Sequence, residues 1–94
     1  MESEKMIEKR FVKAVKNRGW QALKLVCPGF DGMPDRIVLI PGGIVAFVEV
    51  KAPGKKPRAL QEARHKMLRN LGFKVFVLDC TDQIGRIIDE IHSA

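Results

Sequence analysis

The two ends of the chain have apolar residues at the spacing of one face of an α-helix. Near the amino terminus they recur at i, i+4, i+7 and i+8 and are Ile7, Phe11, Ala14 and Val15. This pattern predicts a helix over about residues 3–18, which Gly19 ends, because glycine readily adopts the left-handed conformation that follows many helices. A similar stripe near the carboxyl terminus consists of Ile84, Ile87, Ile88 and Ile91. Thr81 and Asp82 precede it and can cap a final helix.

Between these helices, β-rich runs alternate with segments that contain glycine and proline. Strands are predicted over residues 20–26, 36–40, 44–50 and 73–78. Continuous apolarity over residues 44–48 is typical of a central strand that is covered on both faces. A further helix over about residues 57–71 begins near Pro57 and ends at Gly72. The loop 28–34 contains two glycines and two prolines, so we expect an irregular conformation there.

The predicted order of elements is therefore α-β-β-β-α-β-α. Pro41-Gly42-Gly43 indicates an antiparallel hairpin, and the helix that follows it crosses over to another strand. This combination predicts an α/β fold with a mixed sheet flanked by helices. The 94 residues suffice for one domain and not for two, so residues 1–94 are expected to form a single domain.

Three charged residues stand where folding alone does not require them. Glu49 interrupts the apolar central strand, where an isolated buried carboxylate costs free energy unless it is paired or binds a cation. Lys51 lies two residues later and projects from the same face of that strand. Asp35 directly precedes the neighbouring strand. These three residues are the first candidates for chemistry.

The hairpin brings the two acids together. A three-residue loop over 41–43 pairs Ile40 with Ile44, and the same register pairs Asp35 with Glu49, unless a β-bulge shifts it by one residue. Facing Cβ atoms lie about 4.5–5.5 Å apart, so the carboxylates repel unless a cation such as Mg²⁺ or Mn²⁺ binds them. The alternative is an ion pair between Glu49 and Lys51, with Asp35 capping the preceding loop. The residues alone leave both open.

Other polar residues can approach this pair. Glu8 lies on the core-facing stripe of the first helix and can reach over the sheet, and Glu4 lies one turn before it. Gln61 is in the first turns of the helix over 57–71 and can face either the site or water. We expect His65, one turn later, to lie at the surface.

The charge of the chain favours a polyanionic partner such as nucleic acid. The net charge is +6, and the pI is near 9.7. Six of the basic residues lie between positions 51 and 66 against the single acid Glu62, and they are Lys51, Lys55, Lys56, Arg58, Arg64 and Lys66. A solvated helix face would explain the same pattern without any ligand.

Several other classes of protein are excluded by what the sequence lacks. The two cysteines are too few for a disulfide scaffold or an all-cysteine zinc site. No apolar run is long enough to span a membrane, and no signal peptide is visible. A cytoplasmic protein without a membrane association is therefore expected.

The motifs Gly32-Met33-Pro34-Asp35-Arg36 and Glu49-Val50-Lys51, followed by Gln61, resemble those of the PD-(D/E)xK nuclease superfamily. Within it the chain is similar to the virus-type replication-repair nuclease (VRR-NUC) family in its short, stand-alone form. The resemblance covers nearly the whole chain and implies a restriction-endonuclease-like core. A bare Pro-Asp…Glu-x-Lys pattern is weak, but the hairpin glycines, the basic segment, the glutamine and the element order make it more specific.

The resemblance also implies a role for each of these residues. Asp35, Glu49 and the backbone carbonyl of Val50 would bind Mg²⁺, for which Mn²⁺ can substitute. Lys51 would position the attacking water and stabilise charge that develops on the phosphate. Glu8 would complete the site, with Glu4 as its competitor, and Gln61 would support the site from its helix. DNA contacts are expected from Arg36, Lys55, Lys56, Arg58 and Arg64.

The implied function is a metal-dependent, structure-selective DNA endonuclease that hydrolyses phosphodiester bonds. Branched DNA such as a Holliday junction is the expected substrate, a homodimer the expected assembly, and a bacterial or phage-infected cell the expected setting. The isoleucine stripe near the carboxyl terminus can serve either the core or a dimer interface. The alternative function is a non-catalytic nucleic-acid-binding module, and the intact Asp35, Glu49 and Lys51 set argues against it.

Overall fold

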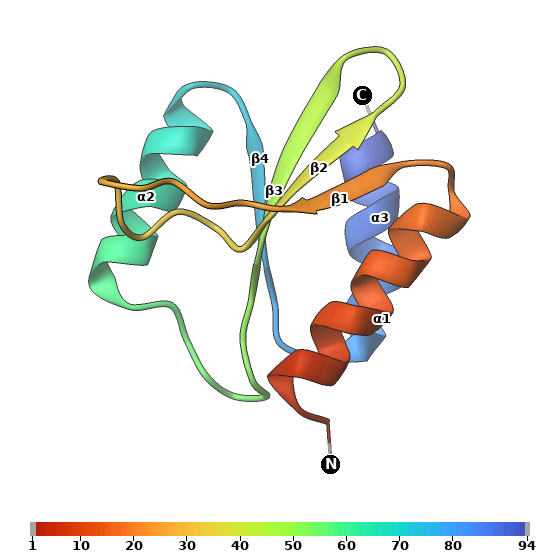
Figure 1. Cartoon of the computed structure of the whole chain (residues 1–94), viewed down its shortest axis with the longest axis horizontal. Coiled ribbons are helices and arrows are strands. Elements are labelled where there is room, and N and C mark those ends of the chain that lie inside the picture. Colours follow the sequence, from red (N-terminus) through yellow and green to blue (C-terminus); the bar gives the residue numbers. More distant parts are fainter. Residues whose placement is uncertain (1, 94) are drawn as a thin grey trace.

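The computed structural model describes residues 2–93, and its elements follow the predicted order (Figure 1). They are α1 (Glu4–Asn17), β1 (Gln21–Lys24), β2 (Arg36–Ile40), β3 (Ile44–Val50), α2 (Ala59–Asn70), β4 (Lys74–Leu78), the 3₁₀ turn η1 (Thr81–Gln83) and α3 (Ile84–His92). Ser3 caps α1, because its hydroxyl accepts a hydrogen bond from the Met6 backbone N–H. No helix within residues 2–93 is long and apolar enough to cross a membrane.

The four strands form one mixed sheet in the order β1-β2-β3-β4. The pairs β1–β2 and β2–β3 are antiparallel, whereas β3 and β4 are parallel and are connected through α2. Helices α1 and α3 cover one face of the sheet, and α2 lies on the opposite face (Figure 1). The predicted α/β fold with a mixed sheet and flanking helices is confirmed.

The larger part of the core lies between the sheet and the helices α1 and α3. Apolar side chains from α1, from the sheet and from α3 meet there, among them Phe11, Val15, Val38, Val48, Ile87 and Ile91. All four isoleucines of the α3 stripe are buried in this core. Within this chain the stripe therefore serves the core, and it offers no exposed apolar face for a dimer interface. A smaller cluster under α2 is formed by Phe47, Leu68 and Val75.

The hairpin between β2 and β3 has the predicted register. Gly42 and Gly43 both have positive φ angles, 92° and 76°, and Ile40 pairs with Ile44. The ladder continues without a bulge to the pair of Arg36 and Val48. The next positions along this register are occupied by Asp35 and Glu49.

The predicted start of the final helix is wrong. Thr81 and Asp82 lie in η1, and Gln83 is the residue that precedes α3. Thr81 does not cap α3, because it lies three residues before that helix, and its hydroxyl and backbone N–H donate hydrogen bonds to the Glu2 carboxylate. The helix over residues 57–71 also begins later than predicted, at Ala59, with Arg58 as its N-terminal flanking residue.

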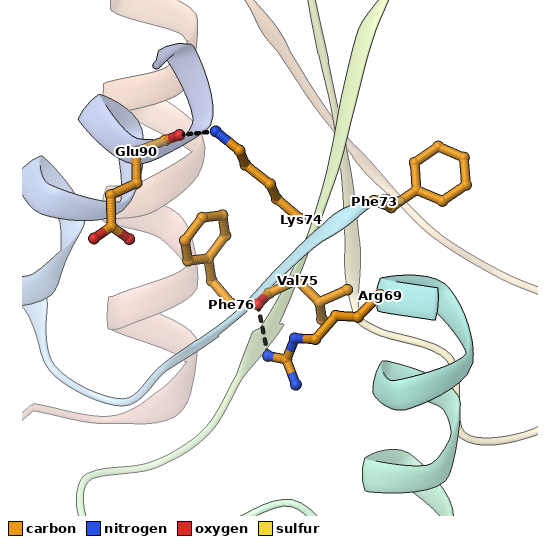
Figure 2. A pocket seen from close by; sticks show the side chains of 6 residues that line it. All are labelled: Arg69, Phe73, Lys74, Val75, Phe76 and Glu90. Atoms are coloured by element: carbon orange, nitrogen blue, oxygen red, sulfur yellow. Dashed lines mark hydrogen bonds between the residues drawn. The ribbon is translucent and has the colours of Figure 1, made fainter. Parts of the chain in front are cut away.

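Two basic side chains attach β4 to the helices on either side of it (Figure 2). The Arg69 guanidinium donates a hydrogen bond to the Val75 carbonyl oxygen at 2.7 Å. The Lys74 ammonium donates to the carbonyl oxygens of Glu90 and Ser93, at the end of α3. A cation at this position also interacts favourably with the negative end of the helix dipole.

The loop that leads to Asp35 is held against α2. The Arg64 side chain donates a hydrogen bond from Nε to the Asp31 carbonyl at 2.7 Å, and its guanidinium stacks 3.7 Å from the centre of the Phe30 ring. Gly32 has a φ angle of +90°, and a Cβ atom there would lie 2.8 Å from Leu60 Cγ. The approach of this loop to α2 therefore requires glycine at position 32.

Replacing Gly32 with alanine should destabilise the protein by about 2–4 kcal/mol. About 1–2 kcal/mol comes from the positive φ angle and the rest from the clash with α2. Gly29→Ala is the matched control, because Gly29 has a φ angle of +79° but no atom within 4 Å of the added Cβ. Urea unfolding of both variants measures the difference, and equal losses of stability would contradict close packing at Gly32.

Candidate active site

The site lies where β2 begins and β3 ends, beside the first two turns of α2. Asp35 directly precedes β2, Glu49 is the penultimate residue of β3, and Lys51 directly follows it. Gln61 and His65 lie four residues apart on α2 and therefore on the same face of that helix. The parallel pairing of β3 with β4 buries this end of β3 in the middle of the sheet.

Asp35 and Glu49 form a pair of neighbouring carboxyl groups. The Asp35 Oδ2 atom accepts a hydrogen bond of 2.7 Å from the Val50 backbone N–H, on the strand that carries Glu49. The Glu49 side chain is 1% exposed. Burial, followed by repulsion from the Asp35 carboxylate, raises the pKa of Glu49 from 4.5 to about 8. Folding thus holds an acid in a position where its charged form is disfavoured.

Three side chains approach the Glu49 carboxylate. The Gln61 amide donates from Nε2 to Oε2 at 3.2 Å, and Nε2 of the His65 ring lies 3.3 Å from Oε1, so that it donates there when the ring carries its proton on Nε2. The Lys51 ammonium lies 3.9 Å from Oε2. This separation is within the range of an ion pair but too long for a direct hydrogen bond. The Lys51 charge partly opposes the rise in the pKa of Glu49.

These contacts bear on the alternative in which Glu49 and Lys51 form a simple ion pair. Glu49 and Lys51 do approach each other, but the shorter contacts of Glu49 are to the uncharged amide of Gln61 and to the His65 ring. Asp35 accepts a hydrogen bond from the facing strand and does not cap its own loop. Two ionised acids and one cation would leave the cluster with excess negative charge, and the raised pKa of Glu49 reflects the cost of that state.

The surface position predicted for His65 is wrong. Its side chain is 2% exposed and contacts Glu49, whereas we had expected a surface residue. Burial, followed by the nearby Arg69 cation, lowers the pKa of His65 below its ordinary value. The available signal was its spacing of four residues from Gln61, which places both side chains on one helix face.

Glu8 lies close to the sheet but is engaged by a cation. Its Oε2 atom accepts a hydrogen bond of 2.8 Å from Arg36 Nε, and both side chains are partly buried. The Arg36 guanidinium also donates to the Ala22 carbonyl oxygen. Glu4, one turn earlier on α1, is exposed, and its charge contributes to the raised pKa of Glu49. Both acids thus remain candidates for the helical ligand.

The basic residues expected to contact DNA divide into two groups. Lys55, Lys56 and Arg58 are exposed in the segment between β3 and α2. Arg36 and Arg64 instead hold parts of the fold together, through Glu8 and through the Asp31 carbonyl respectively. Only the first group has side chains that are free of such fold-stabilising contacts.

The donor set suits a hard divalent cation. Within residues 2–93, no three His, Cys, Asp or Glu side chains gather closely enough to enclose a metal ion. Mg²⁺ does not require such a cage, because it keeps several waters and binds through one or two carboxylates. Asp35 and Glu49 provide two oxygen ligands, and their mutual repulsion is relieved by a cation. The residues present therefore fit Mg²⁺ or Mn²⁺.

A mixed sheet that carries Asp35, then Glu49 and Lys51, on adjacent strands defines the class of PD-(D/E)xK nuclease folds. The VRR-NUC domain model matches residues 2–82. The protein named "Putative nuclease p44" of Acyrthosiphon pisum secondary endosymbiont phage 1 is 48% identical over 79 residues, which cover 84% of this chain and 85% of that protein. A solved VRR_NUC domain structure has a TM-score of 0.87 at 32% identity and covers 97% of both chains. The chain belongs to the VRR-NUC family.

The acidic pair should make the metal-free protein less stable as the pH rises. Because the folded pKa of Glu49 lies near 8 and its ordinary value is 4.5, the folded state binds more protons between these values. Thermal unfolding in EDTA should therefore show that the wild type loses stability relative to Glu49→Gln from pH 5 to pH 8. The comparison is made with this variant because the lowered pKa of His65 contributes with the opposite sign, and the variant should be about 1 kcal/mol more stable at pH 8. Equal slopes in both proteins would contradict the raised pKa.

Glu4→Gln and Glu8→Gln should separate the two helical acids. Loss of Glu8 leaves Arg36 without its partner and should cost about 1 kcal/mol of stability, whereas Glu4→Gln should change stability by less than about 0.5 kcal/mol. Unfolding in EDTA tests these values. Titration with Mn²⁺ then identifies the ligand, because only loss of the acid that completes the site should weaken binding.

Proposed function

We propose that this chain is a metal-dependent nuclease that hydrolyses phosphodiester bonds in DNA. The observation that carries the proposal is the buried Glu49 beside the partly buried Asp35, with the Lys51 ammonium 3.9 Å from the Glu49 carboxylate. Folding stability alone disfavours this arrangement, because like charges in a poorly hydrated position destabilise the sheet. Membership of the VRR-NUC family and the description of the phage relative as a nuclease support the same conclusion.

Asp35 and Glu49 would hold the cation through their carboxylates, with the Val50 carbonyl and Glu8 or Glu4 as additional ligands. When bound, the cation supplies a Lewis acid that stabilises charge on the scissile phosphate and lowers the pKa of a water. Gln61 fixes one oxygen of Glu49, because its own amide oxygen accepts a hydrogen bond from the Arg58 backbone N–H at 2.9 Å. The amide group therefore cannot turn away without losing that bond.

Lys51 would act directly on the reacting phosphate. Its side chain is 16% exposed, so the ammonium is partly desolvated but still reaches the surface at the end of β3. A fixed positive charge at this position stabilises negative charge that develops in the transition state and holds the attacking water. The distance of 3.9 Å from Glu49 keeps the ammonium near the acidic pair without a tight bond that would occupy it.

The segment between β3 and α2 would bind the DNA backbone beside this site. Lys55, Lys56 and Arg58 are exposed there and carry three positive charges within four residues. Contacts to phosphates provide affinity without base specificity. Recognition of DNA shape, and hence of a branched substrate such as a Holliday junction, is the mode that this surface favours. The alternative function, a binding module without catalysis, would use the same surface.

A homodimer is part of the proposal. A single domain of 94 residues has little surface with which to grip two strands, and symmetric cleavage of a junction requires two sites. Because the isoleucine stripe of α3 is buried in the core, other surfaces would have to form the interface.

Cleavage should depend strictly on the cation and on Lys51. Nicking of supercoiled plasmid and of a four-way junction should occur with Mg²⁺ or Mn²⁺ and stop in EDTA. Lys51→Ala should lower kcat by about 10²–10³-fold, while Mn²⁺ affinity stays within a few-fold, because the lost charge does not attract a cation. Lys13→Ala, at an exposed position of α1, is the control. Cleavage in excess EDTA would overturn the proposal, and DNA binding without cleavage under any metal condition would favour the binding module.

Removing the three exposed cations together should weaken DNA binding without changing the chemistry. Alanine at Lys55, Lys56 and Arg58 should lower affinity for unrelated sequences alike and reduce the salt slope by about 2–3. A matched control replaces Lys13, Lys16 and Arg86 with alanine. These substitutions remove the same charge from α1 and α3, which lie on the face of the sheet opposite α2 (Figure 1). Fluorescence anisotropy over a range of salt concentrations measures both slopes. An equal loss in the control would mean that only net charge matters.

A further inference from the structure

Helix α2 presents two side-chain nitrogen atoms to Glu49, one to each carboxylate oxygen. Gln61 donates to Oε2 at 3.2 Å, and Nε2 of His65 lies 3.3 Å from Oε1, where it donates when the ring carries its proton on Nε2. Their spacing of four residues sets the two donors one helical turn apart, on the face that α2 turns toward β3. Both side chains are buried, at 8% and 2% exposure. The family resemblance accounts for Gln61 and gives no role to His65.

The second donor controls an orientation that the side chain of Glu49 does not fix by itself. The terminal torsion of a glutamate is broad, so a carboxylate held through one oxygen can still rotate about that contact. A second hydrogen bond to the other oxygen fixes the plane of the carboxylate. The plane determines where the remaining lone pairs of the Glu49 carboxylate point. Here they must point toward the position where a cation would also contact Asp35.

The chemical type of the donors is also informative. A buried cation hydrogen-bonded to Glu49 would neutralise the carboxylate and compete with a metal ion. Gln61 is uncharged, and a neutral imidazole that carries its proton on Nε2 donates one hydrogen bond without adding charge. Two neutral donors therefore orient Glu49 without neutralising the negative charge that it carries once a cation displaces its proton.

We propose that His65 is a positioning residue, which fixes the carboxylate plane of Glu49 for a divalent cation shared with Asp35. The inference rests on the proposed function, since it assigns His65 to the same metal site. Loss of partners that orient a metal ligand typically lowers metal affinity or activity by 10–100-fold. If His65 only filled space in the core, its substitution would lower stability and leave the metal affinity of the folded protein unchanged.

Mn²⁺ binding to the folded protein provides the test, measured by calorimetry and by electron paramagnetic resonance. His65→Phe fills the same space without a donor, whereas His65→Gln retains an N–H group. We expect His65→Phe to raise the Kd for Mn²⁺ by about 10-fold or more and His65→Gln to restore it to within about threefold. Leu68→Val, at a buried position of α2, should lower the melting temperature without changing the Kd for Mn²⁺. Circular dichroism establishes that each variant is folded.

The wild-type and variant measurements report on different claims. Wild-type protein that binds no Mn²⁺ would overturn the proposed function, and the inference with it. Wild-type protein that binds Mn²⁺ and cleaves DNA, beside a His65→Phe variant with an unchanged Kd, would overturn the inference alone. Unfolding of both His65→Phe and His65→Gln would identify His65 as a core residue and would also overturn it. If Mn²⁺ binding responds as expected but no DNA is cleaved, the positioning role stands and the nuclease proposal fails.

Discussion

The burial of Glu49 beside Asp35 is the constraint on which the rest of the site depends. A carboxylate that is 1% exposed, next to a second acid, is unfavourable in its charged form, and the raised pKa of Glu49 measures this conflict. The fold tolerates it because β3 is held on both sides by other strands and because Gln61 and His65 each contact one oxygen of Glu49. The conflict is relieved when a cation binds, because the cation stabilises the charged form of Glu49 that burial and Asp35 disfavour.

Much of the surrounding structure maintains the position of these two acids. Asp35 lies at the end of an irregular loop. The hydrogen bond from Arg64 to the Asp31 carbonyl and the close approach of Gly32 to Leu60 hold this loop against α2. Glu49 lies on the most buried strand of the sheet. Helix α2 therefore has two tasks, since it supports the loop that delivers one acid and orients the carboxylate of the other. A change in how α2 packs would affect both.

The cations of this chain are likewise divided by their surroundings. Arg36, Arg64 and Arg69 donate to a carboxylate or to backbone carbonyls and connect separate elements of the fold. Lys55, Lys56 and Arg58 remain exposed in the connection between β3 and α2. Net charge alone does not distinguish these groups, because an arginine that bonds to the protein and a lysine in water contribute equally to it. The distinction concerns function, since a cation that already donates to the protein has fewer N–H groups left for phosphates than one that is exposed.

The sequence by itself determined the order of the elements, the hairpin register and the pairing of Asp35 with Glu49. These features follow from local patterns, because the Pro41-Gly42-Gly43 loop sets which residues of the two strands face each other. Only the tertiary structure decided the environment of His65, the use of Arg36 and Arg64 within the fold, and the burial of the α3 stripe in the core. These depend on which helix face meets the sheet. Periodicity indicates which residues share a helix face, but the partners that this face meets are decided by packing between elements far apart in the chain.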